Sequence, residues 1–236
     1  MLEDSASSEC GGLLLGIDTC GVSGSVALGR LARGAVEILG QVELEGRTYS
    51  ISLVAAVGEL LGKAGVQVGD LAAIVAVRGP GSFTGVRVGL SAVKGLAEPA
   101  QIPVVAVSRL EVLAALAGVP TAAIDAHRHE VFLRLGGPAG ESTETLAGAV
   151  ELAGVDPLPR QAAVCDQAAA DLLGSSWPGT ELVRTPAPTA ADALRFAVPR
   201  MAAGQFIDLA LLDGHYLRRS DAEIFGEPVA AGRPRP

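Results

Sequence analysis

The chain has 236 residues, of which 49% are hydrophobic and 19% charged, so a sizeable buried core is expected and disorder is excluded as the dominant state. Its 26 acidic and 18 basic side chains give a net charge of −8, which disfavours binding to nucleic acid through a basic face. No apolar run reaches the roughly 20 residues of a membrane span, and three scattered cysteines without a C-x-x-C pair favour a reducing cytoplasm over a disulfide framework.

The first half of the chain predicts a β-β-β-α-β-α-β series. Short or alternating apolar runs indicate strands, and a change to helical period after Gly46 indicates the first helix, which Gly65 ends. Pro99 is expected to stop the second helix. The expected strands are residues 13–18, 25–28, 35–44, 71–77 and 103–107, and the expected helices are residues 50–65 and 82–97.

The second half repeats this theme less regularly. We expect a helix at 109–117, strands at 122–126 and 130–135, loops and short elements up to residue 188, and a helix at 189–203. Thr189 is the predicted N-cap of that last helix, with Asp192 completing a capping box. The sequence therefore predicts an α/β protein of two related lobes, residues 1–107 and 108–236.

The first predicted helix is more apolar than one sheet requires. Its hydrophobic residues, which include Leu53 and Leu60, fill an arc of roughly 220° on a helical wheel, whereas a helix on one sheet needs about 100°. The surplus face needs a second neighbour, which is either another helix of this chain or another chain.

The second predicted helix carries a face of small residues. Three glycines on one helical face cost about 1 kcal/mol each relative to alanine, so a close packing contact should compensate for them. We predict that the two helices form a docking surface for a partner, and leave open that the small face only brings them together within one monomer. The predicted contact residues on the helices are Leu53, Leu60, Ser82, Gly85, Gly89, Ala92 and Leu96.

The glycine-rich segment that enters the second helix matches no catalytic motif. In Gly79-Pro80-Gly81-Ser82-Phe83-Thr84-Gly85, Thr84 stands where a dinucleotide fingerprint needs its last glycine. A nucleophile elbow around Ser82 would need glycine at Pro80 and at Thr84. We interpret Ser82 as a helix N-cap.

Two aspartates support an alternative function. Asp18 and Asp125 each follow a predicted strand, one in each lobe, and two such acids facing one cleft would suit an ATP-dependent phosphotransferase. His127 and His129 lie two residues apart, so their rings would share one side of an extended strand and could share a metal ion. We interpret these histidines as part of a polar turn, and the metal question stays open.

Several segments together resemble the TsaB (YeaZ) family, in order and in spacing. Residues 78–89, Arg-Gly-Pro-Gly-Ser-Phe-Thr-Gly-Val-Arg-Val-Gly, are the specific part. The other matching segments are residues 16–19, 25–28, 124–126, 130–132 and 216–218. The likeness runs from about Leu13 to Arg219.

The resemblance implies a two-lobed actin, sugar kinase and Hsp70-like (ASKHA) fold and a role in forming N6-threonylcarbamoyladenosine at position 37 of tRNAs that read codons beginning with A. It further implies a non-catalytic scaffold, without a cofactor or metal of its own, that binds and stabilises the catalytic subunit TsaD, with TsaE in the larger complex and tRNA reached only through it. A homodimer in the absence of TsaD and a nucleotide at the partner interface stay open. Tyr49 stands where many family members have histidine, and we place Tyr49 among the partner contacts.

Overall fold

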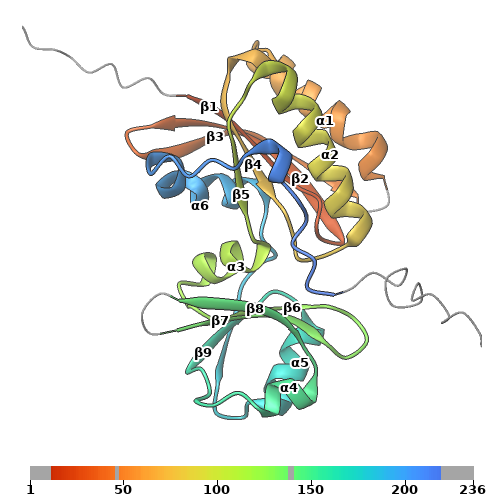
Figure 1. Cartoon of the computed structure of the whole chain (residues 1–236), viewed down its shortest axis with the longest axis vertical. Coiled ribbons are helices and arrows are strands. Elements are labelled where there is room, and N and C mark those ends of the chain that lie inside the picture. The colour runs from red at the N-terminus through yellow and green to blue at the C-terminus, as the bar shows by residue number, and fades with distance from the viewer. Residues whose placement is uncertain (1–11, 46–47, 138–140, 219–236) are drawn as a thin grey trace, which may run out of the picture.

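The computed structural model describes residues 12–45, 48–137 and 141–218, which form two sheets of five strands each (Figure 1). The first sheet has the order β3-β2-β1-β4-β5. Strands β1, β2 and β3 pair antiparallel, whereas β4 and β5 run parallel to β1. Its strands are β1 (Leu13–Asp18), β2 (Ser23–Ala32), β3 (Ala35–Glu45), β4 (Leu71–Val77) and β5 (Val104–Val107).

The second sheet repeats this arrangement. Its order is β10-β9-β6-β7-β8, with β6 in the place of β1 and with antiparallel pairs on one side and parallel pairs on the other. Its strands are β6 (Ala122–Asp125), β7 (Val131–Gly136), β8 (Ser142–Ala147), β9 (Gln161–Val164) and β10 (Glu181–Arg184). The expected two-lobed α/β fold is confirmed.

In the described part of the chain, six α-helices cover the sheets. Helices α1 and α2 pack on the outer face of the first sheet, α4 and α5 pack on the second sheet, and α3 and α6 lie between the sheets and contact each other (Figure 1). The helices are α1 (Tyr49–Ala64), α2 (Phe83–Ala100), α3 (Arg109–Ala117), α4 (Ala149–Ala153), α5 (Gln167–Ser176) and α6 (Ala190–Ala202). Two short 3-10 helices, η1 (Val68–Asp70) and η2 (Leu209–Leu211), complete the elements.

The two inner helices are exchanged between the halves of the chain. Helix α3 follows the last strand of the first sheet but packs on the second sheet, through Leu110 and Leu113 against Ile124 and Phe132. Helix α6 follows the last strand of the second sheet but packs on the first sheet. The boundary expected after residue 107 therefore falls between the two sheets, while residues 190–202 belong with the core of the first lobe.

Local signals set most helix ends. Thr189 caps α6, and its side chain and that of Asp192 form the predicted capping box. Gly65 ends α1 in the left-handed conformation, at φ 68°. The expected stop at Pro99 is wrong: α2 continues to Ala100, because a proline in the last turn removes only one of the final backbone hydrogen bonds.

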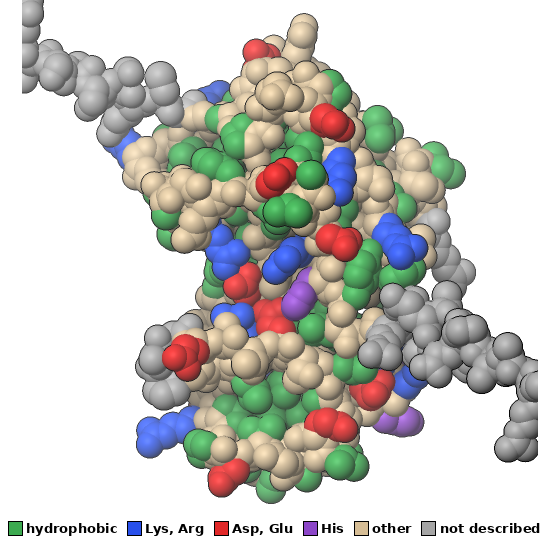
Figure 2. All heavy atoms as spheres, in the orientation of Figure 1, with side chains coloured by type: hydrophobic (Ala, Val, Ile, Leu, Met, Phe, Trp, Pro, Cys, Tyr) green, Lys and Arg blue, Asp and Glu red, His purple; other side chains and the backbone are tan. Residues whose placement is uncertain are grey.

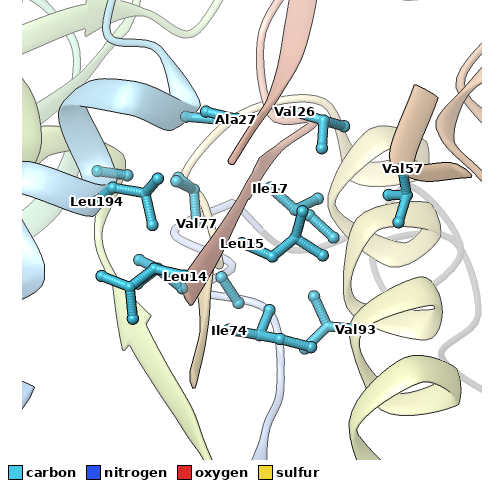
Figure 3. Packing of buried hydrophobic residues seen from close by; sticks show 14 of the residues in the cluster. Leu14, Leu15, Ile17, Val26, Ala27, Val57, Ile74, Val77, Val93 and Leu194 are labelled. Carbon is cyan, nitrogen blue, oxygen red and sulfur yellow. The ribbon is translucent and has the colours of Figure 1, made fainter. Parts of the chain in front are cut away.

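The core of the first lobe lies on both faces of β1 and β4. Leu15 and Ile17 point toward α1 and α2, where Val57 and Val93 meet them, and Leu194 of α6 closes the opposite face (Figure 3). Each of these five side chains is at most 3% exposed. Among the described residues, no helix is both long and apolar enough to pass through a lipid bilayer.

Candidate functional site

Most of the predicted partner contacts are enclosed by the chain itself. Tyr49, Leu53 and Leu60 are 3%, 1% and 5% exposed, and Gly85 and Gly89 are also buried. Periodicity grouped these five residues on a face that the first lobe already covers, so their contact with a partner stays a prediction. Of the other three, Ser82 is exposed and Ala92 and Leu96 are half-buried.

The small face of α2 packs against the turn between β1 and β2. A Cβ atom on Gly85 would lie 2.1 Å from the carbonyl oxygen of Thr19, and one on Gly89 would lie 2.2 Å from the Thr19 hydroxyl oxygen. That hydroxyl donates a 2.7 Å hydrogen bond to the carbonyl of Gly85. The compensating contact expected for these glycines is therefore inside the monomer.

Tyr49 joins the start of α1 to the same turn. Its hydroxyl donates a 2.9 Å hydrogen bond to the carbonyl oxygen of Gly21. Burial, followed by the nearby Asp18 carboxylate, raises the pKa of Tyr49 to about 12. Tyr49 thus has a packing role within the first lobe.

A different face of α1 remains open. Ile51 and Val54 are 81% and 66% exposed, and three neighbours of the same face are exposed as well. Nothing lies within 4 Å of a Cβ atom built on Gly58 or Gly62. On a helical wheel these residues cover an arc of about 100°. We call this surface the α1 stripe; its residues are Ile51, Val54, Ala55, Gly58 and Gly62. The surplus apolar face predicted for this helix is thereby confirmed in part.

Asp18 does not face the cleft as a phosphotransferase would require. It is 1% exposed, its Oδ1 accepts a 2.8 Å hydrogen bond from the Cys20 amide, and its Oδ2 lies 3.5 Å from Nε of Arg109. Although burial opposes the charge, Asp18 raises the pKa of Arg109, which keeps the guanidinium protonated. Burial, with Asp18 next, raises the pKa of the Cys20 thiol well above its usual range, and this thiol donates to the carbonyl of Val77.

Asp125 also ends its strand, as predicted, but its carboxylate serves the turn that follows. One oxygen accepts the His127 amide at 2.8 Å, and the other lies 2.9 Å from Nδ1 of His127. His127, Arg128 and His129 all have positive φ angles, between 57° and 61°, so the extended strand assumed for a shared metal is absent. In the described part of the chain, no cluster of three metal-ligating side chains occurs.

A cleft of about 1000 Å³ separates the lobes. It is lined from the first lobe by the β1–β2 turn and the start of α2, from the second lobe by the β6–β7 loop, and by the C-terminal segment with Tyr216. Ser82 caps α2 here, accepting the Gly85 amide at 3.2 Å, as predicted. The rings of Phe83 and Tyr216 pack in a tilted arrangement, with 5.0 Å between their centroids and 47° between their planes, and Arg87 lies over the Phe83 ring.

Charged groups join the lobes at the waist beside this cleft, where Figure 2 shows acidic, basic and histidine side chains together. Glu144 of β8 accepts hydrogen bonds from Ser108 at 2.6 Å and from Arg134 at 3.0 Å, and lies 2.9 Å from Nε2 of His215. Sequence patterns did not find this network or Arg109, because its members are far apart in the chain and belong to no common motif.

This geometry defines a class: a two-lobed, ASKHA-like α/β protein with a repeated sheet and a cleft between the repeats. A family profile described as TsaD, tRNA N6-adenosine threonylcarbamoyltransferase, matches residues 41–155. A crystal structure from Pseudomonas aeruginosa, described as an uncharacterized protein with similarity to peptidase YEAZ, superposes with a TM-score of 0.70 and 30% identity. The superposition covers 88% of this chain and all of that one. YeaZ from the same organism gives a TM-score of 0.67 and 28% identity over 87% of this chain and all of that one.

The chain belongs to the TsaB (YeaZ) family. The tRNA threonylcarbamoyladenosine biosynthesis protein TsaB of Haemophilus influenzae is 38% identical over 125 residues, which is 50% of this chain and 51% of the relative. TsaB of Bacillus subtilis is 36% identical over 126 residues, which is 52% of this chain and 54% of the relative. The aligned part thus spans about half the length of these curated relatives.

Proposed function

We propose that this protein is a non-catalytic subunit of the machinery that forms N6-threonylcarbamoyladenosine at position 37 of tRNAs reading codons that begin with A. The names of the TsaB relatives support the pathway. The burial of Asp18 beneath Arg109 supports a role without phosphotransfer, because the carboxylate is paired inside the protein and does not line the cleft. In this proposal the protein binds no cofactor of its own and acts in the cytoplasm.

The proposed partner is TsaD, and the α1 stripe is the proposed contact. Glycines in a helix interior are unfavourable unless close packing compensates for them, and at Gly58 and Gly62 the described residues supply no such packing. A stripe of small and apolar residues lets a second helix approach closely and bury Ile51 and Val54. The match of residues 41–155 to the TsaD profile supports a partner of related fold, since related surfaces can pack around a common axis.

The same surface explains the remaining assembly states. A second copy of this chain can occupy the α1 stripe when TsaD is absent, which gives a homodimer. TsaE belongs to the larger complex. Contact with tRNA is made through that complex, because the net charge of −8 makes this chain a poor tRNA ligand on its own. A nucleotide, if one binds, lies at the partner interface, where TsaD can contribute to its site.

The decisive experiment places a charge in the α1 stripe. Ile51→Glu should leave the monomer folded, since the side chain is 81% exposed, and should weaken TsaD binding by about a hundredfold, because a charge would be buried in an apolar contact. Val150→Glu on α4 is the matched control, with 82% exposure on the second lobe, and should leave binding unchanged. Calorimetric titration of purified TsaD measures both affinities.

Three outcomes would contradict the proposal. Equal affinity of TsaD for Ile51→Glu and for the wild-type chain would remove the α1 stripe from the interface. Equal losses in Ile51→Glu and Val150→Glu would indicate a nonspecific effect of added charge. Turnover of ATP by the isolated chain that Asp18→Asn abolishes would restore the phosphotransferase alternative, which needs Asp18 and Asp125.

A further inference from the structure

One buried ion pair connects the two lobes. Asp18 is the last residue of β1 in the first sheet, and Arg109 is the first residue of α3, whose apolar side chains pack on the second sheet. The two side chains are only 1% and 6% exposed, and Nε of Arg109 lies 3.5 Å from Oδ2 of Asp18. The contact therefore acts between the lobes, and little water screens it.

The Arg109 guanidinium is closely surrounded, and its buried Nε faces Asp18 without making a hydrogen bond to any described residue. A Cβ atom on Gly21 would lie 2.5 Å from Nη2 of Arg109 and 2.6 Å from the carbonyl oxygen of Ser23, so glycine at this position lets the guanidinium lie against the turn after β1. The Arg109 amide donates a 2.7 Å hydrogen bond to the carbonyl of Gly79, which ties the start of α3 to the loop before α2. The backbone and the side chain of Arg109 thus both contact the first lobe.

Arg109 also separates Asp18 from the cleft. Arg109 is among the residues that line the cleft, whereas Asp18 is not. A cation entering from the cleft would have to displace the guanidinium before it reached the carboxylate. Since the buried carboxylate requires a positive partner, and the chain itself supplies one, the charge balance at the end of β1 is complete without a metal ion.

We propose that Arg109 is a built-in counter-ion of Asp18 that takes the place of a bound cation and holds the two lobes together without any ligand in the cleft. Two-lobed proteins commonly close around what they bind. In this chain the group that holds the lobes together is Arg109, a residue of α3, and not a bound ligand. The relative position of the lobes is therefore set when the chain folds. The α1 stripe is thereby presented at one fixed orientation to the second lobe.

Hydrogen exchange of backbone amides can test this proposal. The amide at position 109 donates to the carbonyl of Gly79, and the His215 amide donates to the carbonyl of Arg78 at 2.7 Å, so both report on the joint between the lobes. Amides of the β1–β4 ladder report on the first sheet alone. In Arg109→Met, which keeps the length of the side chain but removes its charge, the joint amides should exchange about tenfold faster while the ladder amides keep their rates.

Two further variants separate the joint from general stability. The double variant Asp18→Asn with Arg109→Met leaves no charge unpaired, so it should fold, and its joint amides should still exchange faster than those of the wild type. Lys63→Met removes an exposed ion pair with Glu59, whose side chains are 70% and 49% exposed, and should change no exchange rate. Millimolar Mg²⁺ should leave the melting temperature of the wild-type chain unchanged.

Each opposite result would overturn the proposal. Wild-type rates at the joint in Arg109→Met would mean that the pair does not hold the lobes. If the joint and ladder amides exchanged faster by the same factor, the ion pair would stabilise the whole fold and not the joint between the lobes. Wild-type joint rates in the double variant would assign the effect to an unpaired charge alone. Stabilisation by Mg²⁺ that Asp18→Asn removes would show that a cation reaches Asp18 despite Arg109.

Discussion

Gly85→Ala tests directly whether the small face of α2 packs inside the monomer. Alanine in a helix interior is favoured over glycine by about 1 kcal/mol. The new Cβ atom would, however, lie 2.1 Å from the backbone oxygen of Thr19, so the helix or the β1–β2 turn must move. Such overpacking costs typically about 1–3 kcal/mol, and the closeness of this contact places it at the upper end. We expect a net loss of about 1–2 kcal/mol in the free energy of unfolding.

Gly95→Ala is the matched control in the same helix. Nothing lies within 4 Å of a Cβ atom at Gly95, so only the helix propensity changes, and we expect a gain of about 0.5–1 kcal/mol. Urea unfolding followed by circular dichroism should separate the two variants by about 2 kcal/mol. The packing argument would be refuted if Gly85→Ala were as stable as the wild type, or as strongly stabilised as Gly95→Ala.

Three further measurements follow from individual side chains. Burial raises the pKa of Tyr49 to about 12, so the stability that this residue contributes is present below its ordinary pKa of 10 and is lost as the pH rises toward 12. In an alkaline titration followed by tyrosinate absorbance, one ionisation step should occur at high pH, and Tyr49→Phe should remove it. Burial works against ionisation of Glu144, but hydrogen bonds from His215, Ser108 and Arg134 outweigh it and lower its pKa below the ordinary 4.5. Its stabilising effect should therefore be lost as the pH falls through that lowered pKa, and Glu144→Gln should flatten the acid limb of a plot of stability against pH. Trp177, the only tryptophan, is fully buried and donates a 2.9 Å hydrogen bond to the carbonyl of Leu152, so its fluorescence should stay blue-shifted until the second lobe unfolds; an emission maximum like that of free tryptophan in the native chain would contradict its placement.

The sequence predicted what local patterns encode. Alternating and continuous apolar runs located the strands of the first sheet, and Thr189 with Asp192 located the start of α6. The end of α1 at Gly65 was equally clear, since glycine adopts the left-handed conformation without steric cost. The order of strands and helices predicted two related lobes, and the resemblance to a known family added the ASKHA fold.

What covers each helix face could not be predicted. Periodicity grouped Gly85 and Gly89 on one face correctly, but only the structure places Thr19 against that face. The same limit applies to Leu53 and Leu60, which are apolar enough for a partner surface and yet are enclosed by the first lobe. The joint between the lobes was missed for a related reason, because Asp18 and Arg109 are 91 residues apart and neither belongs to a charge pattern.

The exchange of α3 and α6 bears on the order in which the chain can fold during synthesis. Once residue 107 has left the ribosome, the first sheet can form all five strands, but one of its faces has no helix until residues 190–202 have left as well. Leu14 and Val77, which α6 eventually faces, would meanwhile be open to nascent neighbours or chaperones (Figure 3). The packing of α6 therefore covers the last apolar face of the first sheet, and the nascent chain exposes that face until then.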